Sequence, residues 1–329
     1  YGDNASATDG GADSISLASS ASGSYIYGNI GDDSISVDGG VIASSVYGGS
    51  GKDSIWLANG ASTASMIDGG VGNDFLSLGG LSGTSSLLGG AGEDTITVAG
   101  LAATQWLVDA GDDNDSLFIT NAAERTTVMG GSGDDSINIS VVSKGLVQGG
   151  VGNDTIKVTG TGVTSASLKA GVGDDLMSIT GGITDGSLFG GTGNDSFNFT
   201  GGRATGLVDT GSGLDSVLLG GSGDSITLTG ALTSTSLNAG NGADSLVIQA
   251  NMSAASIQGG TGSDTLNFTA GSASILATTI KGGAGADNIS LYGANDVVFD
   301  IASGDSIFGG TGADTMLFTS TVLSNSIQA

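Results

Sequence analysis

A short glycine-rich turn that ends in aspartate recurs about every 20 residues along the chain. Clear copies read GGSGKD at 48–53, GGVGND at 149–154 and GGTGSD at 259–264, and each copy leads into a short apolar segment. A fixed period of this length is the sequence signature of a solenoid, in which every repeat forms one coil and covers the apolar face of its neighbours. This periodicity limits the possible folds more than any other feature of the sequence.

The aspartate that closes each turn, here called the register aspartate, marks the repeat. The register aspartates are Asp13, Asp33, Asp53, Asp74, Asp94, Asp115, Asp135, Asp154, Asp175, Asp195, Asp215, Asp244, Asp264, Asp287 and Asp314. Turns that supply one carboxylate and several carbonyl oxygens suit a hard cation such as Ca²⁺. A simple glycine corner also favours aspartate, but it would not require the same Gly-x-Asp spacing in so many copies. The sequence therefore predicts multiple Ca²⁺ sites with these aspartates as metal ligands.

The segment after each turn alternates between apolar and polar residues. In one repeat, Ile156 and Val158 share a face while Lys157 takes the other, and Leu168 lies on a second short strand before the next turn. The same two apolar positions recur in nearly every repeat. We therefore expect an all-β fold, a parallel β-solenoid or β-roll with about 20 residues per coil, two short strands per coil and a thin aliphatic core. Residues 1–329 should form a single continuous array, which we expect to be a segment of a longer chain.

The period breaks in two places. The step from Asp215 to Asp224 is 9 residues, and three further 9-residue steps lead from Asp287 through Asp296 and Asp305 to Asp314. A 20-residue coil thus resembles one nonapeptide plus an 11-residue return segment without an acidic turn. In the nonapeptide stretches both corners of a coil could hold ions, whereas elsewhere the ions should form one row along one edge. Asp224, Asp296 and Asp305 lie in degenerate turns and are left out of the predicted ligand set.

The charge balance excludes several classes of partner and metal. The chain has 33 acidic residues, 7 basic residues and a net charge of −26, so direct binding to nucleic acid or to an anionic membrane is disfavoured. No apolar run is long enough to insert into a bilayer. The chain has no histidine and no cysteine, which excludes disulfides and disfavours zinc, copper and iron sites.

The same absences argue against catalysis. No histidine is present to activate a serine, no Ser-Lys pair is evident, and the loops are too short and uniform to build a cleft. We therefore expect no enzyme activity.

Trp56 and Phe118 stand at outward strand positions, where they either contact a partner or lie under a neighbouring loop. Trp106 is expected in the core.

The repeat GGxGxDxUx, in which U is a large apolar residue, resembles the nonapeptide of the RTX (repeat-in-toxin) calcium-binding family. The resemblance covers the whole chain and implies Ca²⁺ held between successive turns by the motif aspartate and backbone carbonyls. It also implies export by type I secretion and folding outside the cell. The 11-residue return segment departs from the family pattern. A one-sided calcium row with a period near 20 resembles the large RTX adhesins, RTX-like surface-layer (S-layer) proteins and a calcium-dependent antifreeze solenoid. The antifreeze pattern places Thr and Asx around the third glycine, and because only Thr192 and Asn194 fit it here, ice binding is expected to be unlikely.

These features together predict a calcium-dependent, secreted structural protein, located outside the cell or on its surface. It would be a segment of a self-assembling surface layer or extracellular filament, whose main partner is another copy of itself. Two alternatives remain open. The chain could be the repeat stalk of an RTX adhesin or the C-terminal RTX module of a secreted enzyme.

Overall fold

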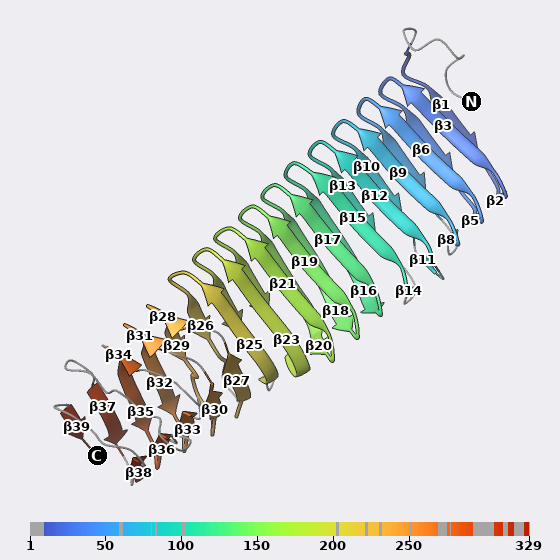
Figure 1. The fold of residues 1–329 in the computed structure, drawn as a ribbon. Coiled ribbons are helices and arrows are strands. Elements are labelled where there is room, and N and C mark those ends of the chain that lie inside the picture. Colours follow the sequence, from blue (N-terminus) through green and yellow to red (C-terminus); the bar gives the residue numbers. More distant parts are fainter. Residues whose placement is uncertain are drawn as a thin grey trace. The chain divides into compact units, whose positions relative to one another are not determined.

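A computed structural model describes residues 10–58, 62–79, 81–82, 84–99, 103–201, 204–220, 223–229, 232–249, 252–268, 275–276, 278–291, 306–311, 315–318 and 326–328. The chain divides into two compact units, residues 1–160 and 161–329, and each is a stack of parallel β-coils (Figure 1). All regular elements of the described residues are strands, and no described helix could cross a membrane. The fold prediction is confirmed in both units. The prediction of one continuous array stays a prediction.

Unit 1 contains two long parallel stacks and one stack of very short corner strands. The strands that follow the turns are β1 (Ser14–Leu17), β4 (Ser34–Val37), β7 (Ser54–Leu57), β10 (Phe75–Leu78), β13 (Thr95–Val98), β16 (Ser116–Glu124) and β18 (Ser136–Ser143). The return strands are β3 (Tyr25–Ile30), β6 (Ser45–Ser50), β9 (Met66–Val71), β12 (Ser86–Ala91), β15 (Leu107–Asp112), β17 (Thr127–Ser132) and β19 (Leu146–Val151). The corner strands are β2 (Ala21–Ser22), β5 (Val41–Ile42), β8 (Ser62–Thr63), β11 (Leu81–Ser82) and β14 (Ala103–Thr104). Every pairing is parallel and matches equivalent positions of successive repeats, as in Ile15–Ile35 and Ile35–Ile55.

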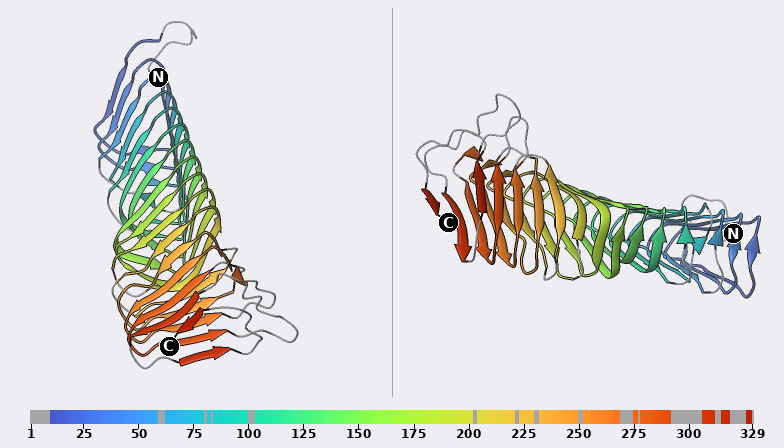
Figure 2. Two further views of the ribbon diagram at one scale, coloured as in Figure 1. Left: turned by 90° about the vertical axis from the view of Figure 1, so that its left-hand side faces the viewer. Right: turned by 90° about the horizontal axis from the view of Figure 1, so that it is seen from below.

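Unit 2 repeats this arrangement. Its strands are β21 (Ser167–Val172), β22 (Leu176–Ile179), β23 (Gly182–Thr192), β24 (Ser196–Phe199), β25 (Ala204–Ser212), β26 (Ser216–Leu218), β27 (Ser225–Thr229), β28 (Leu232–Thr233), β29 (Ser236–Asn238), β30 (Ser245–Ile248), β31 (Met252–Ser253), β32 (Ser256–Thr261), β33 (Thr265–Phe268), β34 (Ile275–Leu276), β35 (Thr279–Ala284), β36 (Asn288–Leu291), β37 (Ser306–Thr311), β38 (Thr315–Phe318) and β39 (Ser326–Gln328). Strand β20 (Thr155–Thr164) includes the division between the units. In the views of Figure 2, the strands of each unit lie side by side in ordered stacks.

The aliphatic core lies between the two stacks of each unit. Most of the described apolar positions that the sequence predicts are fully buried, including Ile35 and Ile55 after the turns and Val46 and Ile67 on the return strands. Burying one such side chain contributes about 1.5–3 kcal/mol. Each coil supplies only a few of them, so a coil depends on its neighbours for a complete core. Trp106 is also buried, with 4% of its surface exposed, as the sequence predicts.

The second and third glycines of each turn have a strict backbone requirement. Gly70 and Gly72 have φ angles of 110° and 129°, and a Cβ atom on either would collide with the carbonyl oxygen of the equivalent glycine in the preceding coil. Such φ values are strained for residues other than glycine. In the described turns, the non-glycine residues with positive φ at these positions are Asn29 and Asp113, with φ angles of 83° and 75°, and Asn and Asp tolerate positive φ best among the others.

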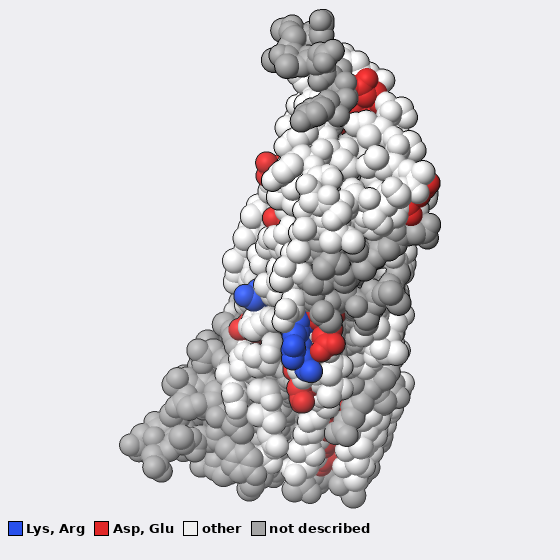
Figure 3. All heavy atoms as spheres, turned by 90° about the vertical axis from the view of Figure 1, so that its right-hand side faces the viewer, with Lys and Arg blue, Asp and Glu red and all other residues white. Residues whose placement is uncertain are grey.

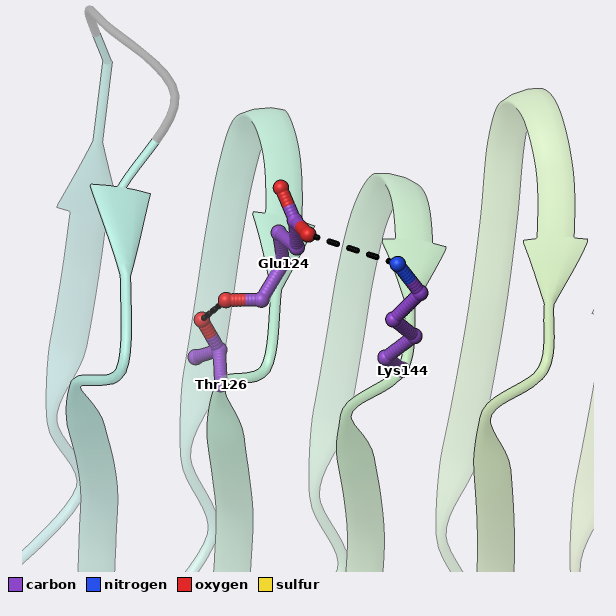
Figure 4. Close-up of polar contacts among 3 residues, drawn as sticks. All are labelled: Glu124, Thr126 and Lys144. Carbon is purple, nitrogen blue, oxygen red and sulfur yellow. Dashed lines mark hydrogen bonds and ion pairs between the residues drawn. The ribbon is translucent and has the colours of Figure 1, made fainter.

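The opposite corner of the coil in unit 1 has its own regular features. One residue per coil adopts the left-handed conformation there, including Ala43, Ala64 and Lys144, with φ angles of 46°, 49° and 53°. Next to it runs a short ladder of serines, in which Ser24 N donates to Ser44 Oγ (3.0 Å) and Ser65 N donates to Ser85 Oγ (3.3 Å). Further along, Lys144 forms an ion pair with Glu124 at 3.7 Å (Figure 4). Both side chains are well exposed, and such a pair contributes little to stability.

The row of acidic turns changes edge within unit 2, which corrects the prediction of a single row along one edge. Before the change, the turn that ends at Asp215 leads from β25 into β26. After the 9-residue step, the turn that ends at Asp224 leads from β26 into β27. Strand β26 pairs with β24 and β29, and β27 pairs with β25 and β30. The turn of Asp224 therefore stacks on the non-acidic corner of the preceding coil, where Ala204 N donates to Asp224 Oδ1 at 2.7 Å.

The physical reason is that nine residues complete about half a coil. The step omits the 11-residue return segment, so the next turn falls at the opposite corner. The strand alternation is preserved across the step, because Val217, Leu219, Ile226 and Leu228 all remain buried. The coil that contains both Asp215 and Asp224 thus has an acidic turn at each corner, as the sequence predicts for a nonapeptide stretch.

Candidate calcium sites

The register aspartates of each unit form hydrogen-bonded ladders along the stack. The Oδ1 atom of one register aspartate accepts the backbone N–H of the register aspartate in the preceding coil. In unit 1, Asp33 N donates to Asp53 Oδ1 at 2.8 Å and Asp53 N donates to Asp74 Oδ1 at 2.7 Å. The pattern continues for Asp13–Asp33, Asp74–Asp94, Asp94–Asp115, Asp115–Asp135 and Asp135–Asp154. One oxygen of each carboxylate is thereby fixed in place inside the turn.

Unit 2 contains two such ladders, one on each edge. The first joins Asp175 to Asp195 at 3.1 Å and Asp195 to Asp215 at 2.9 Å. The second joins Asp224 to Asp244, Asp244 to Asp264 and Asp264 to Asp287 at 2.7–2.9 Å. Asp224 was left out of the predicted ligand set, yet it has the same burial and the same acceptor role as the other members. The 9-residue step that leads to it is the sequence signal that identifies it.

The second carboxylate oxygen of the ladder residues is buried in the protein. For nine of them, Oδ2 makes no hydrogen bond within the described part of the chain; they are Asp33, Asp53, Asp74, Asp94, Asp115, Asp135, Asp195, Asp244 and Asp264. These residues are exposed to only 1–3%. A buried charged oxygen without a partner is costly. The repetition of this cost in coil after coil indicates that a cation belongs in these turns.

Burial of the turns also changes the acidity of the ladder. Removal from water, with a further contribution from neighbouring carboxylates, raises the pKa of Asp115 to about 8 and that of Asp74 to about 7, despite the opposing effect of the backbone hydrogen bond. The same main cause raises the pKa of Asp195 and Asp244 to about 7 and that of Asp53, Asp94 and Asp135 to about 6. Without a cation, the ladder therefore holds protons near neutral pH. A divalent ion would supply the missing positive charge.

The donor set fits calcium. No group of three or more acidic side chains in the described residues could hold a metal without help, so backbone oxygens must complete each site. Asp53 Oδ2 and the carbonyl oxygen of Gly69, from the next coil, both border the position that a Cβ atom on Gly48 would occupy. The same convergence recurs beside Gly28, Gly69, Gly89, Gly130, Gly190 and Gly259. A carboxylate from one coil and carbonyls from its neighbour are the hard oxygen ligands that Ca²⁺ prefers.

A second row of polar side chains lies outside the first and was not predicted. The residue before each register aspartate is often Asn or Asp, and its side chain accepts a backbone N–H of the next coil. Asn153 N donates to Asp134 Oδ1 at 2.7 Å, and Asn194 N donates to Asp174 Oδ1 at 2.7 Å. These outer residues are exposed, so they reinforce the turns from the solvent side. The frequent Asn-Asp and Asp-Asp pairs in the sequence are the signal that could have identified this row.

The structure places the other predicted residues as follows. Asp13 to Asp287 of the predicted ligand set all lie in the ladders, whereas Asp296, Asp305 and Asp314 lie outside the described residues. Trp56 and Phe118 are exposed to 52% and 42%. On the face shown in Figure 3, most described side chains are uncharged. This holds although the chain has a net charge of −26, because many of its carboxylates are buried in the turns.

Comparison with known proteins gives one family match. The model of the RTX calcium-binding nonapeptide repeat matches residues 43–64, 276–299 and 302–318. No curated protein matches this chain. Among solved structures, the crystal structure of a hyperactive, Ca²⁺-dependent, β-helical antifreeze protein from an Antarctic bacterium is similar, with 23% identity, a TM-score of 0.42 and coverage of 88% of this chain and 82% of that chain. This likeness gives no support to the expectation that ice binding is unlikely, which stays a prediction.

The repeat match and the stacked turns lead to the same conclusion. The matched segments are calcium-binding nonapeptides, and each described unit stacks its turns so that buried carboxylates lie coil above coil. These turns require several cations rather than one. The chain contains RTX calcium-binding nonapeptide repeats in the matched segments, and it is a parallel β-solenoid that binds multiple Ca²⁺ ions.

Proposed function

We propose that this chain is a calcium-dependent extracellular structural protein that assembles with copies of itself, as in a surface layer or filament. The observation that supports this most is the repeated burial of a carboxylate oxygen without a protein partner. This burial couples the folding of each such coil to Ca²⁺, because an ion that binds only the folded state stabilises that state. The register aspartates of both edges, Asp224 included, are the proposed ligands.

The location follows from the same coupling. RTX repeats are typical of secreted proteins, and calcium is scarce inside cells but abundant outside. A chain whose turns need Ca²⁺ would stay unfolded during export and become rigid afterwards. Its role is then mechanical, since calcium neutralises the stacked carboxylates and stiffens the coils.

Self-association is supported by apolar side chains on the outer faces of unit 1. Trp56 and Phe75 lie on neighbouring strands β7 and β10, 52% and 38% exposed, with their ring centroids 6.4 Å apart. Phe118 lies on the same face, on β16, and Tyr25 on β3 is 68% exposed. Exposed aromatic residues are enriched at the centres of protein interfaces. A regular sheet face with such residues suits contact with a second copy.

Calcium titration tests the proposal. Far-UV circular dichroism and electron microscopy would be followed together as Ca²⁺ is added, and a chelator would then reverse the change. We expect β-structure and ordered assemblies to appear together and to disappear with the chelator. The variant Trp56→Ser should fold to the same extent as the unmodified protein but should assemble less. The buried Trp106 is left unchanged, so the core of the variant keeps its tryptophan.

Other outcomes separate the alternatives. Calcium-induced folding without assembly would favour a repeat stalk of an adhesin or the RTX module of a secreted enzyme, neither of which needs self-association. We propose no catalytic activity for this chain itself. A chain that is already β-structured in chelator would refute calcium-coupled folding.

A further inference from the structure

A polar groove lies on unit 2 beside the point where the acidic row changes edge. Its volume is about 520 Å³, and its lining includes Thr200, Leu218, Asn238, Asn241, Gln258 and Thr261. This volume falls within the range of small-ligand sites in proteins, about 300–1,000 Å³. The groove combines segments from four successive coils.

The edge change creates this groove. Thr200 belongs to the non-acidic corner that follows β24, whereas Asn241 and Thr261 belong to glycine turns of the second acidic row. On the adjoining strands, Asn238 and Gln258 occupy paired positions of β29 and β32. The non-acidic corner after β24 and the glycine turns of the second acidic row adjoin β26 and β29, which have only three residues each. A hollow therefore forms at this junction.

The lining has no charged side chain, although the chain has 33 acidic residues. Two of its three side-chain amides are fixed by local bonds. Gly240 N donates to Asn238 Oδ1 at 3.1 Å, and Thr261 Oγ1 donates to Asn241 Oδ1 at 2.6 Å. These bonds assign the oxygen of each amide and leave the Nδ2 hydrogens for other partners. Gln258 makes no side-chain hydrogen bond among the described residues.

Two further features belong to the groove and its border. Leu218 lies in the lining, is 42% exposed and offers an apolar surface. Next to it in the sheet lies Asn198 of β24, whose Oδ1 atom is buried and has no hydrogen-bond partner in the described part of the chain. The site thus combines amide donors and acceptors with a small apolar patch, which is the pattern of a specific small-molecule site.

We propose that this groove binds a neutral oligosaccharide of a few sugar units. Sugar hydroxyls both donate and accept hydrogen bonds, so they match the amides of Asn238, Asn241 and Gln258, and the C–H face of a sugar ring matches Leu218. An anionic ligand lacks a cationic partner in the lining and meets the field of a chain with net charge −26. A cationic ligand lacks a carboxylate there. The proposal is independent of self-assembly.

The test is a direct binding measurement on the calcium-loaded protein. A panel of neutral oligosaccharides with three to five glucose, galactose, mannose or N-acetylglucosamine units would be screened and the best binder titrated by calorimetry. The double variant Asn238→Ala/Gln258→Ala should weaken binding about tenfold or more, because each change removes hydrogen bonds to the ligand. The matched control is Asn267→Ala on β33, an outward asparagine of the other strand stack, which should bind as the unmodified protein does.

Circular dichroism in calcium checks that every variant folds, so a loss of binding is distinguished from a failure of calcium-coupled folding. A milder variant, Leu218→Ser, should also weaken binding without touching any amide. The proposal is overturned if no neutral oligosaccharide binds, if the double variant and the control bind equally, or if an unstructured peptide or an acidic polysaccharide competes more strongly than every neutral sugar.

Discussion

The substitution Asp135→Asn should change stability in opposite directions with and without calcium. Asparagine retains an oxygen that accepts the N–H of Asp115, which the aspartate accepts at 2.8 Å. It removes the negative charge of Oδ2, which is buried and has no partner in the described residues. The backbone ladder should survive this change, while the electrostatics of the turn is altered.

In calcium, the variant should be less stable. A site filled at a free Ca²⁺ concentration of 100 times its Kd contributes about 2.7 kcal/mol to the free energy of unfolding. Loss of one carboxylate ligand should remove most of that contribution, so we expect a decrease of about 2 kcal/mol. In chelator, the variant should be more stable, because burial raises the pKa of Asp135 to about 6, so its ionisation at pH 7.5 costs free energy in the folded state. Solvent screening at the turn reduces this gain to roughly 1 kcal/mol.

The assay at pH 7.5 is urea unfolding in millimolar Ca²⁺. In chelator, where the chain is expected to be unfolded, it is refolding by added trimethylamine N-oxide, an osmolyte that favours the folded state. The matched control is Asp134→Asn, which removes the same charge from the adjacent, exposed residue. Asp134 Oδ1 accepts from Asn153 N, and Asn114 already serves as the equivalent acceptor one coil earlier, so this control should change stability by less than about 0.5 kcal/mol in either condition. If Asp135→Asn shifts stability in the same direction with and without calcium, the carboxylate is not a calcium ligand and the reasoning fails.

Three further predictions concern the turns and their ionisation. Gly72→Ala should lower the free energy of unfolding by about 1–3 kcal/mol in calcium, because φ is 129° and the new Cβ atom would meet the carbonyl of Gly51. Gly69→Ala should lower it less, because other coils have alanine at the first glycine position of the turn. Equal losses in urea unfolding would contradict the argument. Ala43→Gly should raise stability by about 0.5–1 kcal/mol, since Ala43 adopts a left-handed conformation at an exposed corner, and a thermal melt that shows no gain would count against strain there. In chelator with the same osmolyte, stability should fall as pH rises from about 4 to 8, because the raised pKa values mean that the folded state binds more protons than the unfolded chain over this window. In calcium, acidification through the same window should instead release the ions. A melting temperature in chelator and osmolyte that rises with pH would refute the assignment.

Much of this architecture follows from the local pattern. The alternation around Ile156 and Val158 is enough to place both in the core, and the fixed spacing of the register aspartates is enough to stack them in a row. The burial of Trp106 agrees with its predicted place in the core. The exposure of Trp56 does not follow from the alternation alone, because an outward side chain could also lie under a neighbouring loop. The carbonyl contacts behind Gly70 and Gly72 could not be predicted, since they depend on how closely successive coils approach.

The edge change shows why counting turns in a repeat sequence does not give their position. Asp215 and Asp224 look like neighbours in one row, because both close a glycine turn. Their positions differ because a turn returns to the same edge only after a full coil, and the nine residues between these two complete about half of one. The strands on either side keep their inward residues, so neither the core nor the turn pattern reports the change. Only the 9-residue length of the step indicates the change. At this step the acidic row leaves one edge of unit 2 and continues along the other.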